Sequence, residues 1–200
     1  METLAGRVLL GDVFDITSGF GGKSSLITGE RVSDMQIEVL KGKSIAPYEV
    51  RKRYWFEFRK ENLTGRTSDT AKLSATPKIL IRKTGDRLIA TFDDSDAYPE
   101  QSLYFLYNKR TNLDWRFILG LLNSETVNLY YRARCLTNRQ TIAHAKKQDL
   151  ERIPIPPVDL SKPDQRKLHD RIVELVDQIN PTAQQEIDRI VGNLYELEGL

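Results

Sequence analysis

The spacing of hydrophobic residues changes near residue 110 of this 200-residue chain, and this change limits the fold class more than any other feature. Before residue 110 the apolar residues stand in short β-branched or aromatic runs that partly alternate with polar residues, which is typical of strands. After residue 110 they recur three and four positions apart, which is typical of helices. The sequence therefore predicts an α+β fold: a strand-rich domain with a twisted mixed sheet, a central helix and two C-terminal helices.

Five segments of the first half are the expected strands. Residues 78–93 should form a hairpin, because two β-branched runs flank the turn sequence Thr84-Gly85-Asp86. Single strands are expected over residues 7–16, 36–42, 53–58 and 102–108. The first of these leads into a glycine-rich stretch.

The central helix is expected over residues 113–133, with an interruption near Asn123-Ser124 where the apolar stripe slips. The proline-rich residues 149–165 follow and predict an extended linker.

Two helices should end the chain. Apolar residues spaced four, three and four apart predict a helix seam: Leu168, Ile172, Leu175 and Ile179. Pro181 is expected to end that helix, and an acidic second helix follows it. We therefore divide the chain into a domain at 1–158 and a helical appendage at 159–200.

The stretch Ser18–Ser25, SGFGGKSS, ends like a phosphate-binding loop, in Gly22-Lys23-Ser24. The first glycine of that motif falls on Thr17, and Gly29 follows too soon for the long helix that would hold the phosphates. A glycine turn after a strand is therefore expected here, with no bound nucleotide.

Catalytic chemistry is not indicated anywhere in the chain. The single Cys135 and the two histidines, His144 and His169, have no metal-ligand spacing. No lysine has an acidic residue two positions before it, which excludes an acid-x-lysine nuclease element. We expect no metal, no cofactor and no catalytic residue, so the sequence favours a binding module.

The formal net charge of +2 conceals an uneven distribution. Residues 1–158 carry 25 basic and 19 acidic side chains, whereas residues 159–200 carry 5 and 9. Within 41–87 the counts are 13 and 5, a net charge of +8, which is the electrostatic pattern of a protein that binds a polyanion. The alternative is a solvated face that only keeps the protein soluble.

Cellular location follows from two further observations. A single cysteine fits a reducing cytoplasm, and no apolar run approaches the length of a membrane span. We expect a cytoplasmic protein without a membrane partner.

Six segments, taken in order, resemble the C-terminal specificity domain of TaqI-like adenine-N6 DNA methyltransferases and type IIG restriction–modification enzymes. That domain is similar to the target-recognition domains of type I specificity subunits. The segments run over nearly the whole chain: LGDVFDITSGFGGKSS, LKGKSIAPYEVRKRYWFEF, PKILIRKTGDRLIATFDDSDAYPEQSLYFLY, FILGLLNSETVNLYY, KKQDLERIPIPPV and IDRIVGNLYELEGL.

The resemblance implies a DNA target-recognition domain at 1–158 whose partners are double-stranded DNA and an upstream methyltransferase domain. The family's catalytic tetrapeptide, of the Asn-Pro-Pro-Tyr type, is absent, because the only Pro-Pro pair is Pro156-Pro157 in IPIPPV. The chain thus resembles a non-catalytic fragment that begins at Met1, separated from its catalytic domain. The alternative is a scaffold whose C-terminal helices assemble with partners and whose basic face is only solubilising.

Basic side chains are the expected DNA contacts, since phosphates fix the register and base edges carry the sequence. The phosphate candidates are Lys23, Lys41, Lys43, Arg51, Lys52, Arg53, Arg59, Arg82 and Lys83. Forked side chains that could read bases gather in the loop-like run RARCLTNRQT: Arg132, Arg134, Asn138, Arg139 and Gln140. The alternative for that run is a polar loop in which Asn138 caps a helix. Three aromatic residues are expected to pack in the core: Tyr48, Trp55 and Tyr104.

Overall fold

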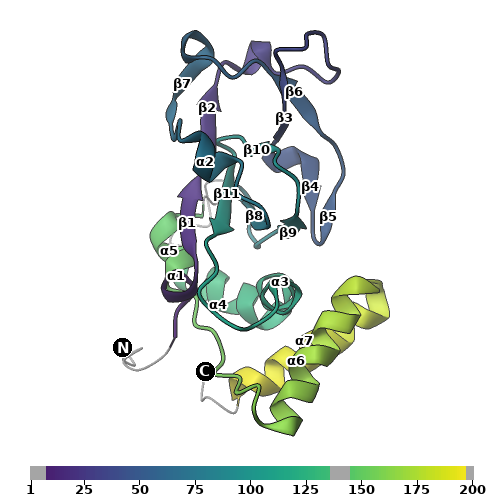
Figure 1. The fold of residues 1–200 in the computed structure, drawn as a ribbon. Coiled ribbons are helices and arrows are strands. Elements are labelled where there is room, and N and C mark those ends of the chain that lie inside the picture. The colour runs from purple at the N-terminus through teal and green to yellow at the C-terminus, as the bar shows by residue number, and fades with distance from the viewer. Residues whose placement is uncertain (1–7, 136–144, 197–200) are drawn as a thin grey trace.

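The structure is a computed structural model that describes residues 8–135 and 145–196. Figure 1 shows an elongated molecule with most strands at one end and helices α6 and α7 at the other. The α+β class expected from the sequence is confirmed.

A four-stranded antiparallel sheet lies in the middle of the molecule, in the order β1-β11-β8-β9. Its strands are β1 (Asp15–Ser18), β11 (Leu103–Tyr107), β8 (Lys78–Arg82) and β9 (Ala90–Asp93). The 78–93 hairpin is confirmed, with Lys78 opposite Asp93. Neighbouring residues of β8 face different cores: Ile79 and Ile81 join one hydrophobic cluster, and Leu80 joins another. The sheet is therefore covered on both faces, which explains why β8 is an almost continuous apolar run.

The smaller strands enclose the second cluster at the strand-rich end. A mixed sheet has the order β10-β3-β6, and two ribbons pair β2 with β7 and β4 with β5. The bounds are β2 (Phe20–Gly22), β3 (Ile37–Leu40), β4 (Ile45–Ala46), β5 (Glu49–Val50), β6 (Tyr54–Phe56), β7 (Leu63–Arg66) and β10 (Tyr98–Pro99). The rings of Phe20 and Phe56 meet inside this cluster at 5.0 Å between centroids.

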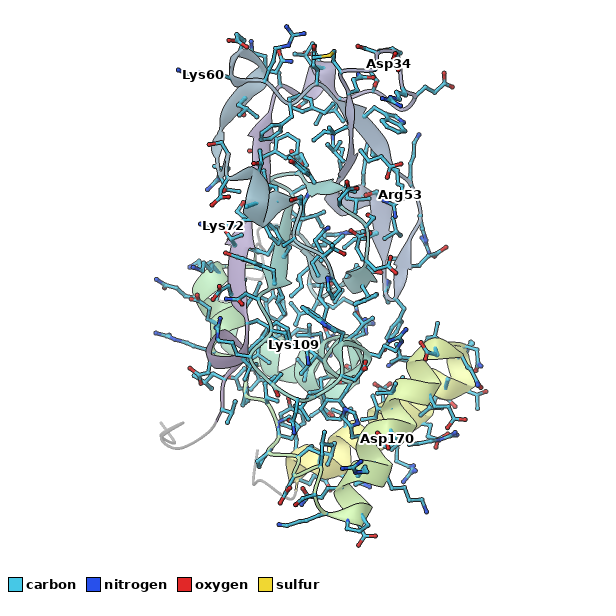
Figure 2. The ribbon with its side chains drawn as sticks, viewed as in Figure 1. Asp34, Arg53, Lys60, Lys72, Lys109 and Asp170 are labelled. Atoms are coloured by element: carbon cyan, nitrogen blue, oxygen red, sulfur yellow. The ribbon has the colours of Figure 1, made fainter. Side chains whose placement is uncertain are left out.

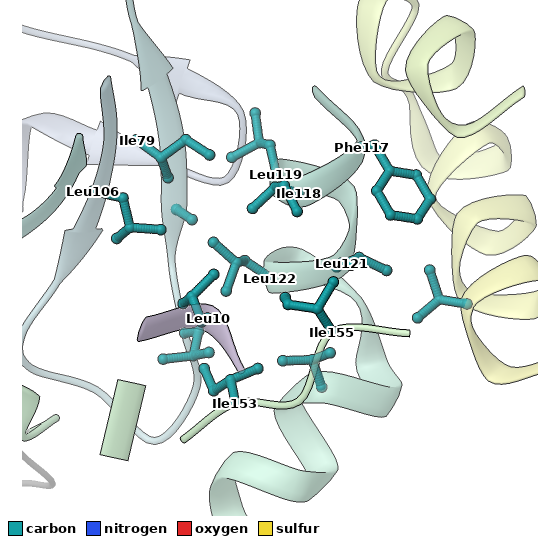
Figure 3. Close-up of a cluster of buried hydrophobic side chains, with 14 of the residues drawn as sticks. Leu10, Ile79, Leu106, Phe117, Ile118, Leu119, Leu121, Leu122, Ile153 and Ile155 are labelled. Carbon is teal, nitrogen blue, oxygen red and sulfur yellow. The ribbon is translucent and has the colours of Figure 1, made fainter. Parts of the chain in front are cut away.

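Helix α3 (Trp115–Asn123) is the centre of the first cluster, and every residue from Phe117 to Asn123 is buried. Figure 3 shows Ile118, Leu119 and Leu122 toward the sheet and Phe117 toward the C-terminal helices. The chain breaks at Ser124 and continues as α4 (Glu125–Cys135), as the sequence predicts. The other helices are α1 (Leu10–Val13), α2 (Thr70–Leu73), α5 (Lys147–Glu151), α6 (Pro163–Asp177) and α7 (Pro181–Glu196).

The C-terminal helices pack against α3 and belong to the same hydrophobic cluster as the sheet. Of the expected seam, Ile172 and Leu175 are buried and Leu168 packs against the cluster. Ile179 is 38% exposed, because α6 ends before it.

Some expected elements differ from the structure. Residues 7–16 do not form one strand: the Asp12 carboxylate accepts a hydrogen bond from the Leu9 amide, and the turn of α1 precedes β1. Of the extended linker expected at 149–165, residues 153–159 lie outside helices as predicted, but α5 extends to Glu151 and residues 153–156 are buried in the protein.

Pro181 does not end α6 but begins α7. The Asn180 side chain accepts hydrogen bonds from the amides of Thr182 and Ala183, both at 3.0 Å. Asparagine before the helix and proline at its first position form a common helix start, which the sequence reading overlooked.

Candidate nucleic-acid interface

Three lysines surround the ring of Tyr54. Their ammonium nitrogens lie 5.7 Å (Lys41), 5.2 Å (Lys43) and 5.1 Å (Lys52) from the ring centroid. We call Lys41, Lys43 and Lys52 the Tyr54 lysine cluster. These distances are within the range in which an aromatic face attracts a cation.

The backbone that carries two of these lysines is held from several sides. The Arg82 guanidinium donates a hydrogen bond to the Gly42 carbonyl at 2.7 Å and another to the Ile45 carbonyl. The Gly42 amide donates to Ser102 Oγ, and the Lys41 amide donates to Ser44 Oγ, both at 2.8 Å. Arg82 therefore shapes the loop that presents Lys41 and Lys43.

A surface hollow of about 400 Å³ adjoins the cluster. Its lining is Lys41, Gly42, Lys43, Arg82, Thr84, Glu100 and Ser102. The single carboxylate of this lining, that of Glu100, is buried and accepts hydrogen bonds from the amide and hydroxyl of Ser102. The hollow is thus predominantly basic.

The backbone of Lys83 adjoins a residue of this hollow, because its amide donates to the Ser102 carbonyl at 3.1 Å. Its ammonium nitrogen donates to Ser18 Oγ and stands 4.3 Å from the centre of the Tyr104 ring. Burial, followed by repulsion from Arg66, lowers the pKa of Lys83 to about 8. Its carbonyl accepts the Ala145 amide at 2.8 Å, so the chain that follows residues 136–144 resumes next to Lys83.

Arg53 does not join the cluster, although it is adjacent to Lys52 in sequence. Its guanidinium bonds Glu38 Oε2 and Ser95 Oγ at 2.9 Å and Asp93 Oδ1 at 3.4 Å. Figure 2 places Arg53 beside the strands of the strand-rich end, whereas Asp170 lies on the C-terminal helices at the other end. The bonds of Arg53 favour a structural role.

Two other exposed arginines have an acidic neighbour. Arg51 pairs with Glu49 at 2.9 Å, and Arg59 pairs with Glu57. Both retain at least half of their side-chain surface exposed, so they remain candidates for phosphate contact.

The glycines expected to form a turn belong to strand β2 (Phe20–Gly22) or directly precede it, and a 3-10 turn begins only at Ser24, which corrects the sequence prediction. A Cβ on Gly19 would lie 2.2 Å from the Pro99 carbonyl oxygen, and one on Gly22 would lie 2.8 Å from the Phe20 ring. The glycines thus allow close packing. The amides of Gly19 and Lys23 bond backbone carbonyls at 3.0 Å, so they are not available as an anion nest, although the Lys23 side chain is exposed.

The run RARCLTNRQT is not a loop at its start, because Arg132 and Arg134 belong to α4. The Arg132 guanidinium pairs with Glu125. Asn138, Arg139 and Gln140 lie outside the described residues, as does His144.

Two residues of the interface were missed by sequence reasoning: Tyr54, which organises the cluster, and Ser102, which links Gly42 to Lys83. The only available signal was an aromatic residue close to Lys52. Their significance depends on strand pairing, which sets Val39 opposite Tyr54 and brings Ser102 to Lys83.

The described part of the chain contains no three His, Cys, Asp or Glu side chains grouped closely enough to hold a metal ion. His169 is buried, and its two ring nitrogens are bonded to the Asp114 amide and the Asp170 carboxylate. No described helix is both long and apolar enough to cross a membrane.

A family model described as the TaqI-like C-terminal specificity domain matches residues 37–155. The chain belongs to this family. The matched region of the specificity domain contains the Tyr54 lysine cluster, the hollow and Lys83. A search of curated proteins finds no match.

Solved structures share the fold of this specificity domain. The type IIL restriction–modification enzyme MmeI, in complex with DNA, has a TM-score of 0.59 and 10% identity over 98% of this chain and 35% of that one. The HsdS subunit from Thermoanaerobacter tengcongensis has a TM-score of 0.53 and 20% identity, and the match covers 99% of this chain and 44% of that subunit. The S subunit of the type I restriction–modification system of M. genitalium has a TM-score of 0.50 and 18% identity, and the match covers 88% of this chain and 41% of that subunit. The chain spans less than half of each of these relatives.

Proposed function

We propose that this specificity domain recognises duplex DNA for a restriction–modification system and positions it for a separate catalytic domain. In this role it is a recognition module without catalysis of its own. Its family membership and its structural likeness to MmeI and to type I specificity subunits support the proposal.

The observation that carries the proposal is the position of the basic groups. Lys41, Lys43 and Lys52 gather at one ring, beside a predominantly basic hollow that Arg82 also lines, and Lys83 is the next residue after Arg82. Within the described residues, none of these four lysines forms an ion pair with a carboxylate, whereas Arg51, Arg53 and Arg59 do. Cations that no internal carboxylate neutralises are suited to neutralise phosphates of an external polyanion.

The parent protein in this proposal is an adenine-N6 DNA methyltransferase, with or without a fused endonuclease, that acts in the cytoplasm. Residues 1–158 would serve as its target-recognition domain, and residues 159–200 as the helical appendage that covers α3. The acidic residues of α6 and α7 would face away from DNA, because like charges repel.

Base reading is assigned in this proposal to the end of α4 and the segment that follows. Arginine pairs with guanine, and asparagine or glutamine pairs with adenine, at the major-groove edge. Substituting Arg132, Arg139 or Gln140 should then change which sequences the full-length enzyme modifies, at a cost of about 1–3 kcal/mol for each altered base pair.

The test is a fluorescence titration of mixed-sequence duplex DNA at several salt concentrations. We expect a dissociation constant of about 10⁻⁴ to 10⁻⁶ M at physiological salt, typical of non-specific binding. Replacing Lys41, Lys43 and Lys52 together by alanine should weaken binding and reduce the slope of log K against log salt by about 0.9 for each lost phosphate contact.

The control removes the same charge elsewhere, by replacing three exposed lysines: Lys147 in α5, Lys162 just before α6 and Lys167 in α6. This variant should bind as the unaltered chain does. If the chain does not bind DNA even at low salt, the basic surface is only solubilising and the scaffold alternative is the better one.

A further inference from the structure

We propose that Tyr54 is a positioning residue that gathers Lys41, Lys43 and Lys52 into one anchoring site for a backbone phosphodiester of nucleic acid. This inference rests on the proposed function and deepens it, because it names the ligand group and the residue that builds its site.

Strand pairing brings the cluster together from distant positions. Strands β3 and β6 are antiparallel, with Val39 opposite Tyr54. Lys41 follows the end of β3 and Lys52 precedes β6 by two residues, and their contacts with the Tyr54 ring place both ammonium groups on the face of the ribbon that carries Tyr54. Lys43 reaches the same ring from the short 3-10 turn Gly42–Ser44, which Arg82 holds in place.

Three ammonium groups around one ring form an unusual charge arrangement. Like charges at facing positions of a ribbon oppose pairing. The negative face of the Tyr54 ring offsets part of this repulsion and holds each flexible side chain toward the same point. No described carboxylate forms an ion pair with any of the three, so the positive charge remains for a ligand.

The chemistry of the lining identifies the ligand as an anion with several acceptor oxygens. Ammonium groups are donors without acceptor capacity, and the nearby Glu100 is buried and bonded to Ser102. The hollow of about 400 Å³ is open beside Lys41 and Lys43 and continues toward Thr84. A phosphodiester of an extended chain can sit at the cluster while its neighbours follow the hollow.

The test compares Tyr54→Leu with Tyr54→Phe, because both remain apolar and only the second keeps the ring. All three lysines are present in both variants. DNA affinity of Tyr54→Leu should fall by about three- to tenfold at low salt, the effect expected from losing cation–ring contacts. Tyr54→Phe should bind within twofold of the unaltered chain.

A second readout separates positioning from a merely structural role. The ε-methylene NMR signals of the three lysines should be shifted by the ring current in the unaltered chain and in Tyr54→Phe, and unshifted in Tyr54→Leu. If the leucine variant fails to fold, the comparison is made between Tyr54→Phe and Tyr54→His, whose ring attracts cations less at neutral pH and should give the intermediate loss. Unshifted signals in the unaltered chain would overturn the inference.

The outcomes also separate this inference from the proposed function. Full binding by Tyr54→Leu together with loss of binding in the triple lysine variant overturns the positioning role and leaves DNA recognition intact. Full binding by both overturns the anchoring site and removes the main support for DNA recognition at this surface. Inorganic phosphate serves as the competitor. If it displaces DNA only at concentrations that also raise the ionic strength, the ligand is a phosphodiester of a polymer. Displacement at micromolar concentration would overturn the inference in favour of a site for free phosphate.

Discussion

Lys78 and Asp93 face each other across strands β8 and β9, with 3.1 Å between Lys78 Nζ and Asp93 Oδ2, and both side chains are fully buried. The Lys78 ammonium also donates to the carbonyls of Ala75 and Ser95. Burial lowers the pKa of Lys78, and the Asp93 carboxylate opposes this shift. A lysine in the most basic region of the sequence therefore serves the core and not the surface.

Replacing Lys78 with methionine should destabilise the fold by about 3–5 kcal/mol, because Asp93 would keep a buried charge without its closest cation. Urea unfolding followed by circular dichroism measures this. The matched control is the double variant Lys78→Met with Asp93→Asn, which removes the stranded charge and should recover part of the loss. An equal or larger loss in the double variant would show that the charge pair is not the cause.

Arg53 and Lys52 are adjacent in sequence, and we expect opposite effects from their replacement by methionine. Arg53→Met should lower the free energy of unfolding by about 1–3 kcal/mol, since Glu38 and Asp93 lose a charged hydrogen-bond partner. Its salt slope for DNA binding should not change. Lys52→Met should leave stability unchanged and weaken DNA binding, with a salt slope reduced by at most about 0.9, because the three lysines share one phosphate. A reduced slope for Arg53→Met would restore Arg53 as a phosphate contact.

Local sequence patterns predicted the secondary-structure elements that neighbouring residues determine. The 78–93 hairpin follows from its turn residues, and the break at Ser124 follows from a slip in the apolar stripe. Local patterns could not predict features that depend on contacts with distant segments of the backbone. A Cβ on Gly19 would lie 2.2 Å from the backbone oxygen of Pro99, so the need for glycine comes from a distant segment, whereas the local pattern indicates only a turn.

The candidate site was likewise predictable from the sequence only in part. Charge density located residues 41–87 as the basic region, but a sequence does not show which cations have internal partners. Arg53 is bonded to Glu38, fifteen residues away, whereas Lys41 and Lys52 meet at Tyr54 through the pairing of β3 with β6.

The packing of α3 on α6 makes Gly120 sensitive to substitution. A Cβ at Gly120 would lie 2.7 Å from Ile172 Cγ2, a branched methyl group close to the backbone of α6. Gly120→Ala should therefore cost about 1–3 kcal/mol of stability through overpacking, which exceeds the helix-propensity gain of about 1 kcal/mol. The control is Gly192→Ala in α7, where the nearest atom is Thr126 Oγ1 at 3.7 Å. That variant should be neutral or slightly stabilised in thermal unfolding.

Lys83 should make DNA binding depend on pH. Its pKa of about 8 lies below the ordinary value of 10.5 because burial and Arg66 disfavour the charged form. The ammonium is therefore present at pH 7 and lost as the pH rises through 8, so affinity for duplex DNA should fall between pH 7 and pH 9.5 at constant ionic strength. The same shift has the opposite sign for folding: the unfolded chain binds the proton more tightly, so the contribution of Lys83 to stability increases between pH 8 and 10.5.

Two variants isolate this group from the other ionisable residues nearby. Lys83→Met has no charge to lose and should bind more weakly at pH 7, with little change up to pH 9.5. Lys83→Arg keeps its charge throughout this range and should hold its affinity if the longer side chain is accommodated beside Ser18 and Tyr104. A fall in affinity with the same midpoint in Lys83→Met would assign the titration to another residue and remove Lys83 from the DNA surface. A fall in affinity with a midpoint near pH 8 that occurs in the unaltered chain and in neither variant would show that the Lys83 ammonium contributes to DNA binding.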